Sequence, residues 1–292
     1  MSAEHQDNFH HVRDFPFFEL PAGLKIELPA VFGFQITKFM VLQVVAAVIV
    51  FLIFRGLSRR LSGGKPARGR FWNFWEMMAL FVRDEVVRPT IGDGHHEHGD
   101  HDHEHGGHSA VPHGGHFADQ YLPFIWGCFF YVLICNLLGA IPFLGSATGN
   151  INVTAVLALA AFGATCLYGV QAMGVGGFFG NLIPDTGMSG VAGLGMSVGM
   201  FAIELMGFLI KHSILALRLF GNIMGGHTAL GVMLAFIAGA AKLGPGLWGL
   251  VTVGSVLGQV GVGLLELLVA VLQAYVFSFL ATIFIAGSIH KH

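Results

Sequence analysis

A few ionisable side chains stand inside long apolar segments of this chain. Three of them are Glu204, Lys211 and Arg218, and a fourth is Glu266. A charge at the centre of a membrane helix costs about 2.5 to 3.5 kcal/mol on insertion scales, so such residues normally face protein or a water-filled path. These residue types in these segments indicate that the chain moves an ion or a charged substrate through a membrane.

The spacing of the first three residues places them on one side of a helix. Glu204, Lys211 and Arg218 are seven residues apart in turn, which drifts by only about 20° per step. A guanidinium stays protonated, so Arg218 cannot carry protons but can supply a fixed positive potential that attracts a carboxylate and repels protons. Glu204 and Lys211 have a second interpretation, in which they pair with other buried groups and only fix the packing.

Two further polar residues follow Arg218 in the same segment. Asn222 lies four residues beyond Arg218 and shares its face. His227 lies nine residues beyond, which an ideal helix places on the opposite side unless the Gly225-Gly226 pair distorts it. We therefore expect His227 to face a different cavity from the one that Arg218 faces.

The last apolar segment carries a second polar stripe. Glu266 and Gln273 are seven residues apart, and Gln259 lies another seven back. A carboxylate and a neutral imidazole both exchange protons near neutral pH, so Glu266 and His227 together could pass protons. For His227 alone, a core histidine with a purely structural role is nearly as good an interpretation.

The composition requires a membrane for these segments. Of the 292 residues, 54% are apolar and 11% are charged, against about 25% charged residues in an ordinary soluble domain. The fold class is therefore an all-α integral membrane protein. The net charge of −2 gives no reason to expect a nucleic-acid partner. The three cysteines lie in apolar segments without CxxC spacing, so we expect neither a disulfide nor a metal site there.

The pattern of apolar runs divides the chain into five parts. Residues 1–34 form a polar extramembrane arm, 35–57 a first transmembrane helix, 58–116 a cytoplasmic basic loop with an amphipathic interfacial helix and a His-rich loop, 117–172 a transmembrane hairpin, and 173–292 a Gly-rich linker with two membrane helices.

Those two last helices are too long for a perpendicular crossing. A helix over residues 196–238 would measure roughly 65 Å, about twice the hydrocarbon thickness of a bilayer. The stretch 247–289 has the same length. Either each stretch holds two spans, or each is one strongly tilted helix, and two overlong helices joined at residues 242–245 are the simplest arrangement.

The basic residues predict the orientation. Eight Lys and Arg residues lie between positions 55 and 88, whereas Lys242 is alone in the turn between the long helices. By the positive-inside rule the amino terminus is outside and the carboxy terminus is cytoplasmic. A bacterial plasma (inner) membrane is the default location.

A low-complexity tract separates the interfacial helix from the hairpin. Residues 93–116 contain nine of the sixteen histidines. Imidazoles can bind divalent metals, but the tract lacks the fixed spacing of a structural site. A solvated linker is therefore the favoured interpretation, and metal binding remains open.

Several stretches resemble subunit a of F-type ATP synthases. Residues 217–222, Leu-Arg-Leu-Phe-Gly-Asn, look like the family signature, and residues 272–277 look like its carboxy-terminal companion. Glu204 and Lys211 also match the family's spacing upstream of the arginine. Residues 152–154, Asn-Val-Thr, resemble the start of the family's third span. The similarity covers most of residues 117–289, whereas the His-rich loop has no counterpart in the common family pattern.

The resemblance implies a mechanism and partners. The two long helices would be steeply tilted and wrap a ring of c subunits, with peripheral-stalk b subunits in the same complex. Arg218 would separate two aqueous half-channels that carry protons to and from the ring carboxylates, and Asn222 and Gln273 would support that contact. Many bacterial members carry a glutamate at the position that matches His227 and a histidine at the position that matches Glu266. This chain has the two exchanged, which is similar to mitochondrial forms. Glu204 and Lys211 would lie near the inside exit, and the chain would need no cofactor and catalyse no reaction itself.

Two other classes of function remain as alternatives. A divalent-metal transporter would use the His-rich loop as a metal buffer, but it predicts intramembrane His and Asp ligands at i+4 spacing, which the spans lack. A membrane scaffold would leave the costly charge of Arg218 unexplained. Whether the ion is H⁺ or Na⁺ depends on the ring site, which belongs to another chain.

Overall fold

The computed structural model of this chain describes residues 17–19, 25–27, 29–31, 34–61, 69–92, 117–141, 145–181, 191–241 and 244–289. The His-rich tract 93–116, Lys242 of the predicted outside turn and the carboxy-terminal residues 290–292 lie outside these ranges. Within them, five helices are long and apolar enough to cross a membrane. The chain is thus a multi-pass membrane protein, and the predicted all-α class is confirmed.

Helices make up nearly all of the described chain. Two short antiparallel hairpins precede them, formed by β1 (Phe17–Glu19) with β2 (Lys25–Glu27) and by β3 (Ala30–Val31) with β4 (Phe34–Gln35). The helices are α1 (Lys38–Leu61), α2 (Arg70–Phe81), the π-helix η2 (Val82–Val87), α3 (Arg88–Ile91), the 3₁₀-helix η3 (Phe117–Tyr121), α4 (Leu122–Gly139), the 3₁₀-helix η4 (Ala147–Gly149), α5 (Ile151–Asn181), α6 (Val191–Ala240) and α7 (Pro245–Ile289).

The core lies around α4. This helix is apolar on all sides, which is the pattern of a helix surrounded by others. It packs against α7 on one side and α1 on another. Its fully buried side chains include Ile125, Phe129 and Phe130, and the edge of Phe130 meets the ring of Phe54 from α1 with 5.1 Å between centroids. The other helices are thereby arranged around a fixed centre.

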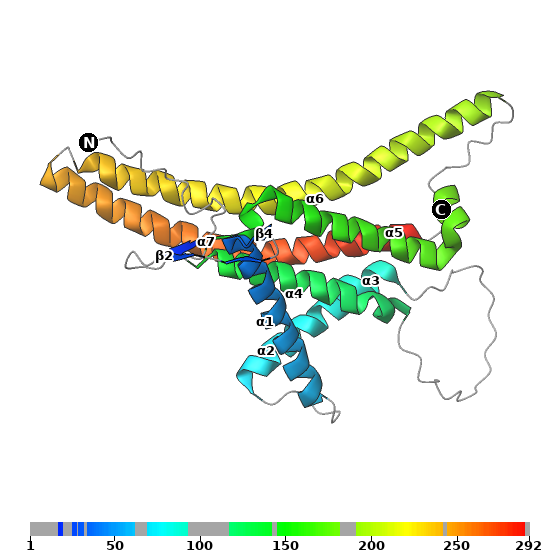
Figure 1. Cartoon of the computed structure of the whole chain (residues 1–292), viewed down its shortest axis with the longest axis horizontal. Helices are drawn as coiled ribbons and strands as arrows, with labels where there is room; N and C mark the ends of the chain where they lie inside the picture. The colour runs from blue at the N-terminus through cyan, green and yellow to red at the C-terminus, as the bar shows by residue number, and fades with distance from the viewer. Residues whose placement is uncertain are drawn as a thin grey trace, which may run out of the picture.

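The two long helices form an extended hairpin. Figure 1 shows α6 and α7 lying side by side near the turn that joins them, while the amino-terminal half of α6 diverges from α7. Helix α5 contacts both of them. It bends at Gly174, whose φ of 74° lies in the left-handed region that glycine adopts without strain.

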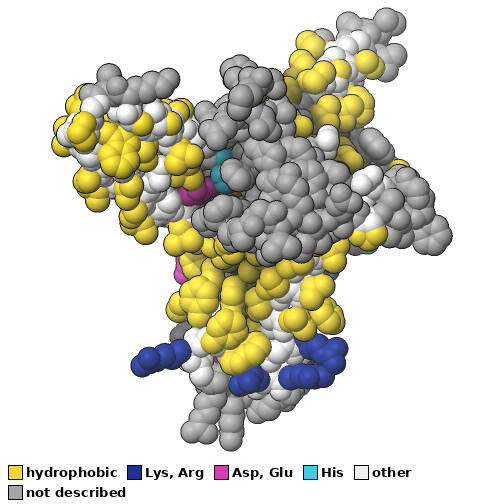
Figure 2. Space-filling view, turned by 60° about the vertical axis from the view of Figure 1, so that its left-hand side comes forward, with side chains coloured by type: hydrophobic (Ala, Val, Ile, Leu, Met, Phe, Trp, Pro, Cys, Tyr) yellow, Lys and Arg dark blue, Asp and Glu magenta, His cyan; other side chains and the backbone are white. Residues whose placement is uncertain are grey.

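Basic residues collect where α1 ends. Arg59 and Arg60 occupy the last turn of α1, and the Arg60 guanidinium lies 4.7 Å from the centre of the Trp72 ring of α2. Figure 2 shows Lys and Arg side chains gathered at one end of the molecule, beyond a broad band of hydrophobic side chains. This separation of charge from apolar surface is the one expected at a membrane boundary.

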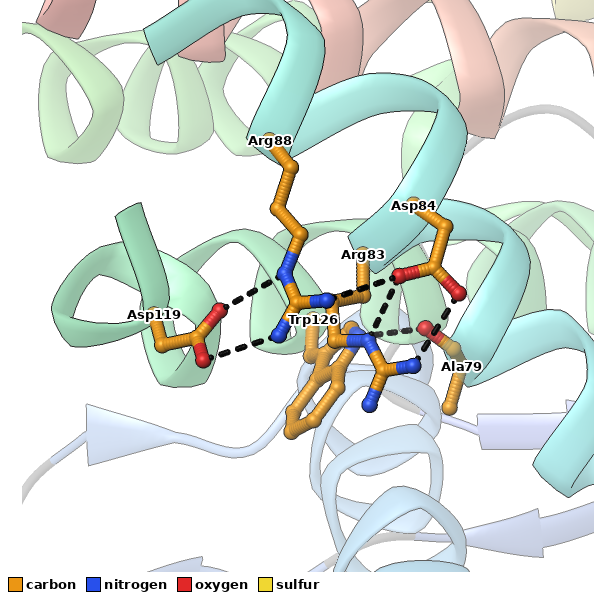
Figure 3. Close-up of polar contacts among 6 residues, drawn as sticks. All are labelled: Ala79, Arg83, Asp84, Arg88, Asp119 and Trp126. Atoms are coloured by element: carbon orange, nitrogen blue, oxygen red, sulfur yellow. Dashed lines mark hydrogen bonds and ion pairs between the residues drawn. The ribbon is translucent and has the colours of Figure 1, made fainter. Parts of the chain in front are cut away.

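An ion-pair network ties the helices α2, η2 and α3 to the start of α4 (Figure 3). Arg88 donates to both carboxylate oxygens of Asp119, at 3.1 Å and 3.0 Å, although 31 residues separate the two. Asp84 accepts from Arg83 at 2.7 Å and from Arg88 at 3.4 Å. The indole of Trp126 donates to the carbonyl of Ala79 at 2.9 Å. Together these contacts join the described segments that flank the His-rich tract.

We expect a pH-dependent stability contribution from Asp84. The hydrogen bond from Arg83 holds the pKa of this carboxyl below its usual value, against the opposing effect of burial, and the charges of Arg83 and Arg88 act in the same direction as the hydrogen bond. A carboxyl with a lowered folded-state pKa stabilises above its unfolded pKa of about 3.9 and loses this contribution as pH falls through the folded value.

Replacing Asp84 with asparagine should lower the free energy of unfolding at neutral pH by at most about 1 kcal/mol, because the pairs are largely exposed. The difference from the wild type should vanish in strong acid. Thermal unfolding of the detergent-solubilised chain across this pH range measures it, with Glu85→Gln as the matched control. A deficit of the same size in strong acid would contradict the assignment to the Asp84 charge.

A second polar cluster is fully buried beside α7. The hydroxyl of Thr148 donates to the side-chain oxygen of Asn136 at 3.1 Å and lies 3.0 Å from the hydroxyl of Ser146. The Asn136 amide in turn donates to the backbone carbonyl of Ala270 at 3.5 Å. Because buried polar groups need partners, this chain of contacts fixes η4 and α4 against the middle of α7.

Candidate ion-translocation site

The rotation of α6 about its own axis is set by an inward-facing stripe. His212, Leu215, Leu219 and Ile223 follow helical spacing, and all four are buried. The His212 ring lies among Phe162 of α5, Phe208 of α6 and Phe284 of α7, with ring centroids 5.2, 4.8 and 4.6 Å away. This packing against two other helices determines which residues of α6 point outward.

The three charged residues of α6 are among those that point outward. Glu204, Lys211 and Arg218 are all exposed. Their neighbours on the outer surface are large apolar side chains, including Ile214 and Leu217 at 48% and 55% exposure. Within the described part of the chain Arg218 forms no ion pair with any carboxylate. A permanent charge on an apolar surface calls for a counter-charge from beyond the described residues.

Asn222, four residues beyond Arg218, is half-buried. Gly221 and Gly225 lie on either side of it along the helix, and a side chain added at either glycine would meet no atom of the described chain within 4 Å. The surface around Arg218 is therefore open to close approach by a second backbone.

On α7 the polar residues point inward. Glu266 and Gln273 are buried, with 8% and 4% of their surface exposed. The Oε1 atom of Glu266 has no hydrogen-bond partner within the described residues. An uncompensated buried polar atom is costly, so this carboxyl is a functional candidate.

The close approach of α6 to α7 brings Glu266 against Gly226, the residue that precedes His227. A Cβ placed on Gly226 would lie 3.1 Å from both the Cδ and the Oε1 atoms of Glu266, so the carboxyl rests directly on the Gly226 backbone. His227 is the next residue and is half-buried. Figure 2 shows Asp or Glu and His side chains at a recess beside a hydrophobic lobe. The acid that the sequence singled out on α7 thus rests on the backbone of α6 one residue before the imidazole that it singled out there.

We expect Gly226→Val to impair transport without preventing assembly. The added side chain would displace the Glu266 carboxyl, and if this carboxyl transfers protons, its misplacement should lower the rate on the order of tenfold or more. Gly239→Val is the matched control, because a Cβ there meets nothing within 4 Å. The measurement is ion transport by membrane vesicles, normalised to the amount of the chain in the membrane. Equal pumping by both variants would show that the position of Glu266 does not matter.

Glycines at positions 225 and 226 predict either close approach of another helix or a distortion of their own helix. The structure shows close approach at Gly226, and it identifies Glu266 of α7 as the side chain that lies there, which the sequence did not predict. The seven-residue spacing that links Gln259, Glu266 and Gln273 also extends one step further back, to Thr252.

Among the described residues, no three His, Cys, Asp or Glu groups lie close enough to hold a metal ion.

Comparison with known proteins identifies a family for this chain. The sequence profile of the ATP synthase A chain family matches residues 109–286. The ATP synthase subunit a of Chloroherpeton thalassium is 31% identical over an alignment of 296 positions, which spans 98% of this chain and 77% of the relative. Subunit a 2 of Chlorobaculum tepidum is 30% identical, over 94% of this chain and 70% of its own length. Subunit a of Myxococcus xanthus is 32% identical, over 97% and 88% respectively.

The matched region contains α4 to α7 except for the last residues of α7, and so includes every candidate site residue. Both the profile and the relatives identify the membrane sector of one complex. The chain therefore belongs to the ATP synthase A chain family, the membrane-embedded subunit a of ATP synthase.

Proposed function

We propose that this chain is the stator that conducts protons to and from the carboxylates of a rotating c-ring. Two aqueous half-channels, each open to one side of the membrane, would end at the ring, and Arg218 would lie between them. Ion flow from one half-channel to the other then requires the ring to turn. The observation that carries the proposal is the exposed guanidinium of Arg218 on an apolar helix surface, where it pairs with no carboxylate among the described residues.

Arg218 would keep the passing ring carboxylate ionised while that carboxylate is out of contact with water. An opposite charge within about 4–6 Å favours the ionised form of a carboxyl group. The same positive potential repels protons and so prevents direct leakage between the half-channels. Asn222 and Gln273 would support the contact by hydrogen bonding.

The remaining residues would line the two half-channels. His227 and Glu266 would transfer protons in the outside half-channel, since one is on each side of the α6–α7 seam. Glu204 and Lys211 would lie near the inside exit, on the part of α6 that precedes Arg218. The swap of acid and imidazole relative to many bacterial members keeps one group of each kind in the path.

The energy would come from the membrane potential and the proton gradient. The potential contributes about 2.3 kcal/mol per charge per 100 mV. No bond is made or broken in this subunit under the proposal, and ATP would form in other chains. The c-ring and the peripheral-stalk b subunits would be its neighbours in a bacterial plasma (inner) membrane, with the amino terminus outside.

The test is complementation of cells that lack this chain. Vesicles from cells that carry the wild-type chain should acidify on addition of ATP, and vesicles without it should not. Adding Na⁺ should leave the rate of acidification unchanged if H⁺ is the coupling ion. Equal ATP-driven acidification with and without the chain would overturn the proposal.

A further inference from the structure

The helices α1 and α2 meet at a corner that carries an excess of positive charge. Arg55, Arg59 and Arg60 lie in the last two turns of α1, and Arg70 is the first residue of α2. Glu76 is the only carboxylate on these two helices, so four arginines against one acid leave a net charge of +3 here. The corner lies at the end of the molecule where Figure 2 shows Lys and Arg side chains beyond a broad apolar band.

The ring of Trp72 fixes the two helices against each other. A Cβ placed on Gly56 of α1 would collide with the six-membered part of the Trp72 indole, so the ring lies directly on the α1 backbone. The neighbouring ring of Phe71 meets Trp72 edge to face, with 5.4 Å between centroids. The indole is thereby wedged between α1 and the first turn of α2.

Arg60 is held in place by this indole. Its guanidinium carbon lies 4.7 Å from the centre of the Trp72 ring, within the range of about 6 Å for a cation–π interaction. The side chain is exposed, and among the described residues it pairs with no carboxylate and donates no hydrogen bond. The N–H donors of the guanidinium are therefore left for a ligand.

The fixed position of Arg60 suits it to bind phosphate. A guanidinium matches two oxygens of a phosphate group with parallel hydrogen bonds. An arginine side chain usually loses rotamer freedom when a ligand orders it, and a side chain that is already held loses less. The contact with Trp72 thus lowers the entropic cost of binding an anion at this corner.

The surroundings of Arg60 favour a phosphate that belongs to a lipid. Phe71 and Phe74 are 60% and 48% exposed, and Met77 is exposed next to them at helical spacing. The exposed apolar face of an interfacial helix lies among the acyl chains of the bilayer. Because Trp72 contacts both Phe71 and Arg60, this apolar face begins beside the cation. A phospholipid offers a partner to both, whereas a soluble phosphate offers one only to the cation.

We propose that the α1–α2 corner is a binding site for an anionic phospholipid, with Arg60 holding the phosphodiester and with Phe71 and Phe74 against the acyl chains. The other arginines of the corner add long-range attraction, as clusters of Lys and Arg beside a membrane helix do for anionic lipids. A zwitterionic lipid is a poorer ligand, because its own ammonium group compensates the phosphate charge. The site is independent of the proton-conducting role proposed for the chain.

The test is lipid binding by the full chain in detergent. Phosphatidylglycerol and phosphatidylcholine with identical acyl chains are titrated separately, and bound lipid is counted by native mass spectrometry. The wild type should prefer phosphatidylglycerol, and Arg60→Ala should lower its affinity on the order of tenfold, because a hydrogen-bonded charge is lost. Arg60→Lys should lose less, since it keeps the charge without the planar fork. An unchanged affinity in Arg60→Ala would overturn the site.

Arg55→Ala is the matched control. Arg55 is also exposed at this end of α1, but it lies five residues before Arg60 and so about 140° away around the helix. Its removal should lower the affinity for phosphatidylglycerol by about twofold or less, because exposed charges are screened by salt. Equal losses in Arg55→Ala and Arg60→Ala would show diffuse attraction to the whole corner and overturn the site. Displacement of the lipid by excess inorganic phosphate would do the same, since it would identify a soluble anion as the ligand.

A double-mutant cycle tests the part played by the indole. Trp72→Leu should weaken binding of phosphatidylglycerol by about threefold, because the guanidinium loses the ring that holds it. In a chain that already carries Arg60→Ala, the same substitution should have no further effect, since the two residues act as a unit. Additive losses would show that Trp72 contributes without positioning Arg60, which would contradict the preordered site.

Discussion

Replacing Arg218 with alanine is expected to abolish ATP-driven proton pumping while the complex still assembles. The residue is exposed on α6, with no ion pair inside the described part of the chain, so little folding stability depends on it. Under the proposed mechanism, its loss would leave a ring carboxylate without its counter-charge. An uncompensated charge at a helix centre costs about 2.5 to 3.5 kcal/mol, which corresponds to a fall in the ionised fraction on the order of 100-fold.

Two readouts separate the roles of Arg218. Loss of coupled pumping shows that the ring carboxylate needs the positive charge, and a raised passive proton leak shows that Arg218 seals the two half-channels from each other. Arg218→Lys should recover part of the pumping, because it keeps the charge but loses the planar, forked guanidinium.

Lys211→Ala supplies the comparison for Arg218. It removes another exposed cation seven residues away on the same helix, and it should lower ATP-driven pumping less than Arg218→Ala does. Normal coupled pumping by Arg218→Ala would refute the mechanism.

Replacing Glu266 with glutamine should slow pumping by about tenfold or more, since a positioned acid–base group contributes on the order of 100-fold or more to a proton transfer and His227 remains. The substitution keeps the size of the side chain, so its packing against Gly226 is preserved and the loss reports on the proton.

Vesicle acidification at matched levels of complex measures the effect of Glu266→Gln. Glu266→Asp should retain more activity, because the carboxyl group is still present though set back by one methylene. If Glu266→Gln pumps as well as the wild type, Glu266 is a packing residue and the outside path must use other groups.

Chemistry at single positions was predictable because it depends on residue type and local spacing. The charges of Glu204, Lys211 and Arg218 stand out in an apolar segment, and their seven-residue spacing places them on one side of any helix. The five apolar helices follow in the same way from runs long enough to cross a bilayer.

Contacts between distant parts of the chain were not predictable in this way. Arg88 and Asp119 are joined across the His-rich tract, and Thr148 reaches Asn136 from a separate turn. Each partner alone is an ordinary polar residue near a helix end. Which residues pair depends on the relative position of whole helices, and the periodicity of either helix carries no information about that.

By itself, then, the sequence determined that this is an all-α membrane protein, which residues could translocate protons and which family it resembles, because these depend on composition and on spacing within one helix. Only the tertiary structure decided that the Glu266 carboxyl rests on Gly226, next to His227 in the chain, and that Arg218 is exposed while Glu266 and Gln273 are buried. Those contacts depend on the rotation and register of two packed helices, which side-chain packing among α5, α6 and α7 sets.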